Sequence, residues 1–187
     1  MANINDYLIW RGDLPINSIC KFNEIDSMIL ARFSYLLFNK IKMQKEETIA
    51  SISNKMKDFD NEEFRYNGDK EMINHLGQSD RFKNMLVTDF IEINDKKTEK
   101  QFSAITVHIS NKELYVSFIG TDNSIIGWKE DFNMAFMHEI PAQLEGLKYL
   151  KYIATKYPES KIRIGGHSKG RKCSNIFCNI CSKWNSR

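Results

Sequence analysis

The hydrophobic period of the chain changes at residue 86, and this change constrains the fold more than any other sequence feature. Three runs follow it, LVTDFIEIND at 86–95, QFSAITVHIS at 101–110 and ELYVSFIG at 113–120, and each alternates apolar with polar residues. Alternation with a period of two is the pattern of β-strands. The connections between the runs are short and polar, so we expect the three strands to form an antiparallel meander.

A helix and a further strand are predicted after the meander. The segment PAQLEGLKYLKYIATKYPES begins at Pro141, places apolar residues at helical spacing and meets Pro158 near its end. Proline is tolerated in the first turn of a helix and stops a helix that reaches it later. KIRIGG at 161–166 then reads as a short strand. A helix that leads into a strand is the crossover pattern of an α/β sheet.

The N-terminal part is predicted to be helical. Residues 22–39 read as a core helix, and the polar, lysine-rich stretch 40–85 reads as two or three short surface helices. The apolar stripe of the first helix consists of Ile25, Ile29, Leu30, Phe33, Leu36 and Leu37. The fold class is therefore α/β, with N-terminal helices followed by a mixed sheet that helices flank.

Residues 166–170, Gly-His-Ser-Lys-Gly, match the pattern G-x-S-x-G directly after the last predicted strand. In this pattern a serine sits on a sharp strand-to-helix turn, the nucleophile elbow, where Gly166 and Gly170 allow strand and helix to approach closely. The turn exposes the Ser168 hydroxyl as a nucleophile, and the N–H of Lys169 can donate to an oxyanion. The alternative is a plain glycine-rich loop. His167 is not the catalytic base in such a motif, and we expect it to pack or to act indirectly.

A second motif follows the run that ends in FIG. It comprises Thr121, Trp128 and Asp131 in the segment TDNSIIGWKEDF. This arrangement resembles the class-three lipases, in which a strand ends F-R-G-T/S and a Trp-x-x-Asp follows. The resemblance implies that Thr121 and Lys169 form the oxyanion hole and that Trp128 and Asp131 support the loop beneath it. Ile119 stands where those lipases usually have arginine.

Several further segments, DYLIWRGD, VTDFIEIND, KQFSAIT and GWKEDFNMAF, occur in order along residues 1–170. With the two motifs, they resemble the Mbeg-like family of uncharacterised, lipase-like α/β-hydrolase proteins of bacteria. The resemblance implies an α/β-hydrolase fold and an esterase or lipase activity on an acyl-ester or lipid-like small molecule, with no cofactor.

The sequence lacks the rest of a catalytic triad where this fold has it. Such a hydrolase orders its triad Ser, then Asp or Glu, then His, but no acidic residue and no histidine follows Ser168. The remaining histidines apart from His167 lie upstream, at His75, His108 and His138. Without a base a serine hydroxyl is a poor nucleophile. We therefore expect a truncated, inactive serine-hydrolase-like protein; the alternative is a non-catalytic binding or interaction protein on a hydrolase-derived scaffold.

The segment 171–187, RKCSNIFCNICSKWNSR, departs from the family, in which Gly-Asn and small, apolar residues are expected after the elbow. We divide the chain into 1–170, the N-terminal part of a single α/β-hydrolase domain, and this atypical basic, cysteine-rich tail. Under one allowed choice of codons, a shift by one base turns the tail into GNAVIFSAIFAQNGIQ, which restores Gly-Asn and an apolar helix. A frameshift after Gly170 is therefore predicted.

Charge and composition argue against several classes of protein. The net charge is +3, but the tail holds four basic and no acidic residues, so residues 1–170 carry −1. A near-neutral body does not favour a nucleic-acid-binding face. No membrane span and no signal peptide are evident, so we expect a cytoplasmic protein. Two alternatives remain: contact of the basic tail with nucleic acid or membrane, and a metal site of Cys173, Cys178, Cys181 and His167.

Overall fold

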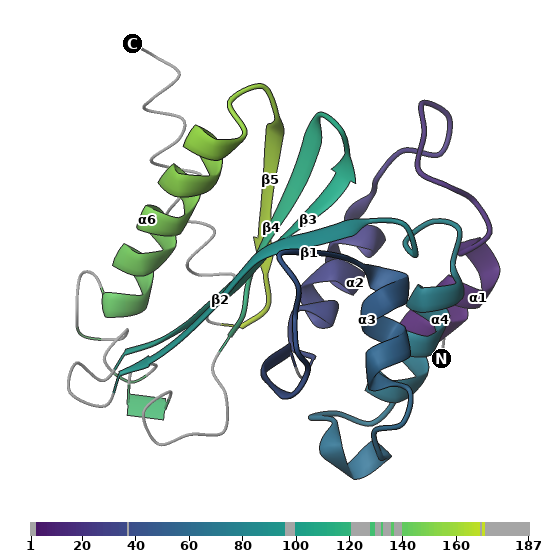
Figure 1. The fold of residues 1–187 in the computed structure, drawn as a ribbon, viewed down its shortest axis with the longest axis horizontal. Helices are drawn as coiled ribbons and strands as arrows, with labels where there is room; N and C mark the ends of the chain where they lie inside the picture. Colours follow the sequence, from purple (N-terminus) through teal and green to yellow (C-terminus); the bar gives the residue numbers. More distant parts are fainter. Residues whose placement is uncertain are drawn as a thin grey trace.

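A five-stranded open sheet lies between two layers of helices in the computed structural model of the chain (Figure 1). The structure describes residues 3–36, 38–95, 100–120 and 140–168, together with Trp128, Lys129, Phe132, Phe136 and Gly170.

The strand order of the sheet follows the chain, β1-β2-β3-β4-β5. The strands are β1 (Glu46–Thr48), β2 (Leu86–Asp95), β3 (Lys100–Ser110), β4 (Glu113–Phe118) and β5 (Lys161–Gly166). Neighbours from β1 to β4 are antiparallel, whereas β5 pairs with β4 in parallel. The predicted meander, crossover and α/β class are therefore confirmed. Only β1 was not predicted.

Helices of the N-terminal part cover one face of the sheet, and a single described helix, α6 (Pro141–Lys156), covers the other (Figure 1). The first group comprises α1 (Ile4–Arg11), α2 (Glu24–Phe33), α3 (Ile49–Met56) and α4 (Asp69–Gln78), with short 3-10 turns at Phe38–Lys40 and Asn61–Glu63. Each layer has its own apolar core. Val87, Ile105, Val107 and Tyr115 face the N-terminal helices, whereas Ala104, Leu114, Val116 and Phe118 face α6.

Two expectations about the N-terminal part need correction. The helix predicted over residues 22–39 ends at Phe33, and Ile25 at its start is 41% exposed instead of lying in the core. The helices α3 and α4 lie within the predicted stretch 40–85, but they are not merely surface helices. Their apolar sides are fully buried because they pack against each other and the sheet, as shown by Ile49, Ile52, Met56, Ile73 and Leu76.

The polar residues of the alternating runs are also buried, because both faces of the sheet are covered. The Thr106 hydroxyl lies 2.8 Å from the hydroxyl of Tyr149 on α6. On the other face, the Ser117 hydroxyl donates to Ser34, just after α2, at 3.0 Å. Each helical layer is therefore joined to the central strands by a buried hydrogen bond as well as by apolar packing.

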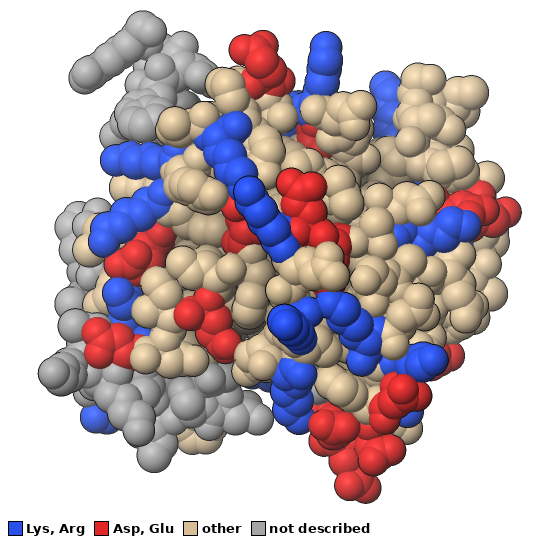
Figure 2. All heavy atoms as spheres, in the orientation of Figure 1, with Lys and Arg blue, Asp and Glu red and all other residues tan. Residues whose placement is uncertain are grey.

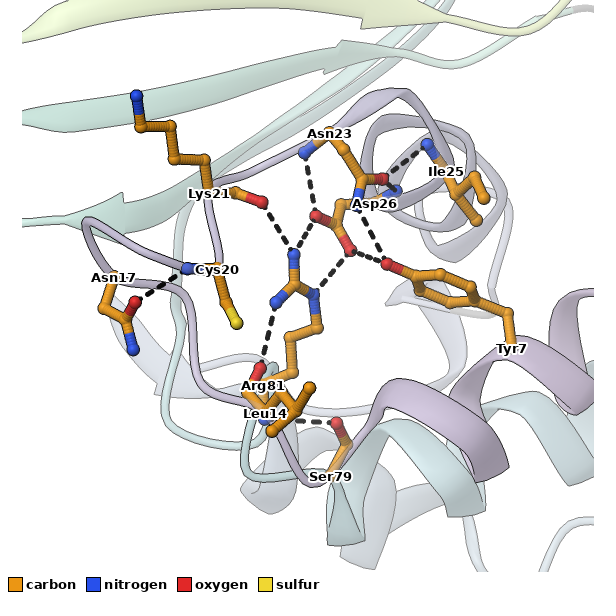
Figure 3. A network of polar contacts seen from close by, with 10 residues as sticks. All are labelled: Tyr7, Leu14, Asn17, Cys20, Lys21, Asn23, Ile25, Asp26, Ser79 and Arg81. Atoms are coloured by element: carbon orange, nitrogen blue, oxygen red, sulfur yellow. Dashed lines mark hydrogen bonds and ion pairs between the residues drawn. The ribbon is translucent and has the colours of Figure 1, made fainter.

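A buried ion pair fixes the long connection between α1 and α2 (Figure 3). The Arg81 guanidinium donates to both carboxylate oxygens of Asp26, and both side chains are almost completely buried. Arg81 also donates to the carbonyl oxygens of Leu14 and Lys21 in that connection. The Tyr7 hydroxyl donates to Asp26 as well. One arginine thus connects α1, α2 and the segment before β2.

The molecular face seen in Figure 2 shows lysine and arginine interspersed with aspartate and glutamate. That face offers no broad region of one sign for a polyanion. None of the helices that the structure describes is long and apolar enough to cross a membrane. Within the same residues, no cluster of three or more His, Cys, Asp or Glu side chains could hold a metal ion.

Candidate active site at the turn after β5

The candidate site lies where the parallel strands β4 and β5 end. Phe118, the last residue of β4, pairs with Gly166, the last residue of β5. Both strands therefore end at the same edge of the sheet. Ligands in open α/β sheets bind outside the carboxyl ends of parallel strands. Ile119 and Gly120 follow one strand, and His167 and Ser168 follow the other.

Ser168 occupies a left-handed backbone conformation, with φ of 57°. This region is uncommon for residues other than glycine and is found where surrounding structure enforces it. The side chain is exposed at the tip of the turn. The N–H of Gly170 donates to the His167 carbonyl oxygen at 3.0 Å, which closes the turn around Ser168.

The glycines on either side of Ser168 permit a very close approach to β4. A Cβ atom at Gly170 would lie 2.1 Å from the Phe118 carbonyl oxygen, and one at Gly166 would lie 2.6 Å from the same oxygen. Any side chain at these positions would push the turn away from the strand. The two glycines thus allow the turn to lie directly against the end of β4.

Gly120 brings the end of β4 into direct contact with this turn. A Cβ atom there would lie 2.7 Å from the His167 carbonyl oxygen and 3.1 Å from Cβ of Ser168. Thr121, the predicted oxyanion residue, follows Gly120 directly but lies outside the described residues, as do Lys169 and Asp131. Their predicted roles therefore stay predictions.

Tyr35 joins the two strand ends, and sequence reasoning missed it. Its hydroxyl accepts a hydrogen bond from the Gly120 N–H at 2.8 Å and donates to the His167 carbonyl oxygen at 3.0 Å. The Tyr35 side chain is buried, and the Arg65 guanidinium stacks over its ring at 5.1 Å. One phenol thus fixes the spacing between the turn that carries Ser168 and the segment that leads to Thr121.

The predicted packing of His167 has a specific partner, because its ring stands edge-on to Tyr35, with 5.6 Å between centroids. Nδ1 lies 3.4 Å from the Tyr35 hydroxyl. Trp128 is 66% exposed, and its predicted role as a support stays a prediction. Phe132 and Phe136 are similarly exposed and stack on each other at 5.0 Å.

The other two described histidines lie away from Ser168. His108 pairs with Leu114 near the start of β4, whereas the turn adjoins the end of that strand. Its ring packs against Tyr157, and burial lowers the pKa of His108. His75 lies on α4 and contacts Glu71. His138 and the cysteines of the alternative metal site lie outside the described residues.

Two hollows adjoin the site. A cavity of about 190 Å³ lies beside Gly120, with Tyr35 and Arg65 in its wall. A groove of about 490 Å³ runs between α2 and β5 and reaches His167. The first hollow borders the segment after β4, where Gly120 contacts Ser168.

Comparison with known proteins identifies the family. The model of the Mbeg1-like family matches residues 76–178, which is more than half of the chain. The chain belongs to the Mbeg1-like family. The Mbeg1-like match contains β2 to β5, α6 and the G-x-S-x-G turn, and it runs past Gly170 into the segment 171–187. Tyr35 and Arg65 precede it. No curated protein and no solved structure matches the chain.

Proposed function

We propose that this Mbeg1-like chain has an α/β-hydrolase scaffold of the esterase or lipase type, with Ser168 in the position of the nucleophile. We further propose that these 187 residues alone do not hydrolyse esters. The substrate class of the complete site is an acyl ester of a small molecule. The free thiol of Cys20 is compatible with the cytoplasm, which we propose as the location.

The single observation that carries the proposal is the left-handed conformation of an exposed serine in the turn that follows β5. Holding a non-glycine residue in this region costs about 1–3 kcal/mol, so the surrounding structure has to enforce it. A nucleophile needs this conformation because it lifts the hydroxyl out of the sheet edge toward a substrate.

The surroundings of Ser168 would suit a tetrahedral oxyanion. The N–H of Lys169 follows the serine directly, and Thr121 follows Gly120, which contacts the serine. Donors from these two segments would converge on one oxygen of the substrate, as an oxyanion hole requires. Tyr35 would hold the segments at a fixed separation.

The proposed lack of activity follows from the missing base. Among the side chains that the structure describes, no imidazole or carboxylate has a recorded contact with the Ser168 hydroxyl. A hydroxyl with no general base stays protonated and attacks an ester slowly. The same observation supports the second candidate function, a protein that binds a ligand at this site without converting it.

Labelling with a fluorophosphonate tests the proposal. In this reaction the serine oxygen forms a bond to phosphorus, fluoride leaves, and a base takes the proton. We expect no labelling of the purified chain alone. Added imidazole should serve as the base, and the fluorophosphonate should then label Ser168 about tenfold faster than Ser110. A tenfold difference is smaller than the effect of a positioned general base. Ser110 is an exposed serine at the end of β3 and serves as the internal control.

Mass spectrometry of the labelled peptides, with Ser168→Ala as a blank, gives the readout. Rapid labelling without imidazole would show a complete catalyst and overturn the proposed inactivity. Equal labelling of Ser168 and Ser110 with imidazole would overturn the hydrolase-type site and leave the binding function.

A further inference from the structure

We propose that the cavity beside Gly120 binds a small, neutral, polyhydroxylated molecule, such as a sugar or glycerol unit. As the alcohol part of an ester, this unit would define the substrate of the site; that link rests on the proposed function. The binding itself does not depend on catalysis.

The location of the cavity places a bound molecule next to Ser168. Tyr35, Ile119 and Gly120 form one wall. Gly120 is in contact with the serine, since a Cβ atom there would lie 3.1 Å from Cβ of Ser168. A hydroxyl group of a ligand in this cavity could therefore carry an acyl group toward the serine.

The polar lining combines hydrogen-bond donors and acceptors and has no net charge. Arg65 only donates hydrogen bonds and Glu92 only accepts them, so their charges balance. Amide side chains do both, and the cavity is lined by three of them: Asn39, Asn94 and Gln101. Hydroxyl groups also donate and accept, so a polyol matches this lining, whereas an anion would meet Glu92 and a cation would meet Arg65.

Aromatic rings provide the apolar part of the lining. Phe38 and Phe90 border the cavity. The rings of Phe38 and Phe90 lie 5.5 Å apart and tilted, so they present a continuous apolar surface. Such a surface packs against the C–H groups of a sugar ring, while the polar groups at the edge determine its orientation.

The size of the cavity limits the ligand. Its volume of about 190 Å³ is below the range of about 300–1,000 Å³ that accommodates drug-sized ligands. A long acyl chain does not fit inside it. The exposed rings of Trp128, Phe132 and Phe136 instead favour an apolar ligand such as an acyl chain. The experiment therefore includes an apolar ligand beside the polyols.

Titration of the ¹⁵N-labelled 187-residue chain with methyl glucoside, glycerol and hexanoate tests the inference. We expect methyl glucoside to give saturable shifts of the amides at residues 101–103 and 119–120. Saturation by glycerol at lower concentration would identify a glycerol unit as the preferred member of the class. Absence of saturation by both polyols, or tighter binding of hexanoate at the same amides, would overturn the inference.

Substitutions locate the binding. Asn94→Leu should weaken binding of methyl glucoside about threefold to tenfold, the net value of one hydrogen bond. Asn84→Leu is the matched control, because Asn84 is also exposed but lines a different hollow, near His108. Equal effects of the two substitutions would contradict binding in this cavity. Binding of methyl glucoside is measured without any ester or fluorophosphonate, so failure of the labelling experiment and failure of this inference remain distinguishable.

Discussion

At the scale of single residues, the Tyr35 hydroxyl is the most consequential group near Ser168. Replacing it by Tyr35→Phe leaves the buried Gly120 N–H without its partner and removes one of the two donors to the His167 carbonyl oxygen, which keeps the Gly170 N–H. We expect the free energy of unfolding to fall by about 1–3 kcal/mol, the cost of an unpaired buried polar group. Urea denaturation of the two proteins measures this difference.

Tyr66→Phe is the matched control. Its ring also stacks with Arg65, at 5.2 Å, but the part of the chain that the structure describes shows no hydrogen bond of its hydroxyl. We expect a change of less than about 0.5 kcal/mol, as for most substitutions away from a buried network. Equal losses in the two variants would mean that the bridge between the strand ends contributes nothing specific.

Sequence reasoning could place Ser168 but not Tyr35, for a physical reason. The serine lies between two glycines within five residues, and that local spacing predicts the turn. The partners of Tyr35 lie 85 and 132 positions along the chain. Their contact exists only once α2, β4 and β5 have packed together, so no local pattern reports it.

At the scale of elements, an irregularity in β2 holds α6 on the sheet. The register between β2 and β3 shifts between Thr88 and Ile91, and Asp89 within this bulge has φ of 55°. Its carboxylate accepts hydrogen bonds from Tyr152, Lys156 and Tyr157, at the C-terminal end of α6 and just beyond it. The bulge thus turns a strand residue into the anchor of a helix.

Asp89→Asn should lower the free energy of unfolding at pH 7 by about 1.5–3 kcal/mol, the range for hydrogen bonds to a charged group. Asp80→Asn is the control. Its carboxylate pairs with Lys83, and both side chains are substantially exposed; such surface pairs contribute about 0–1 kcal/mol. An equal effect of both substitutions would show that Asp89 has no special role.

The pH dependence of the Asp89 contribution has a definite sign. Burial opposes ionisation, but hydrogen bonds from Lys156, Thr88 and Tyr152 outweigh it and lower the pKa of Asp89 from 3.8. A lowered pKa stabilises the fold above the unfolded value, and the stabilisation is lost as pH falls through the folded value. The difference between wild type and Asp89→Asn should therefore shrink below about pH 4 in denaturation experiments. A constant difference would exclude the carboxylate as its source.

Helices and strands with a long hydrophobic pattern could be predicted from the sequence, whereas a very short strand could not. The strands β2 to β5 and helix α6 each carry enough alternation or helical spacing to be identified. Strand β1 contains only Glu46, Glu47 and Thr48, and nothing in those three residues indicates pairing. The burial of α3 and α4 depends on their packing partners, so composition alone suggested surface helices.

At the scale of the whole molecule, the ion pair of Arg81 and Asp26 joins the N-terminal helices to the sheet. Arg81 precedes β2, whereas Asp26 lies on α2, the helix that leads to Tyr35 (Figure 3). The hydrogen bond with Asp26 raises the pKa of Arg81 despite its burial. The family match begins at residue 76, so this contact connects the matched part to helices outside it.

Arg81→Met should therefore destabilise the whole chain and not one layer. The substitution leaves the Asp26 carboxylate buried without its counter-ion, a loss of about 3–5 kcal/mol. That is a large fraction of the roughly 5–15 kcal/mol that stabilises a typical domain. Urea denaturation of the ¹⁵N-labelled chain, followed by the amide signals of the N-terminal helices and by those of the sheet, should show one shifted transition for both signals.

The double variant Asp26→Leu/Arg81→Met removes both charges and should recover part of the loss, because no unpaired charge then remains in the interior. It should not recover all of it, since the carbonyl groups of Leu14 and Lys21 still lose a donor. Separate transitions of the two signals in Arg81→Met would mean that the helical layer and the sheet unfold independently. In that case Tyr35 could detach from Gly120 and His167 while the sheet stayed folded, and the spacing of the candidate site would depend on this ion pair.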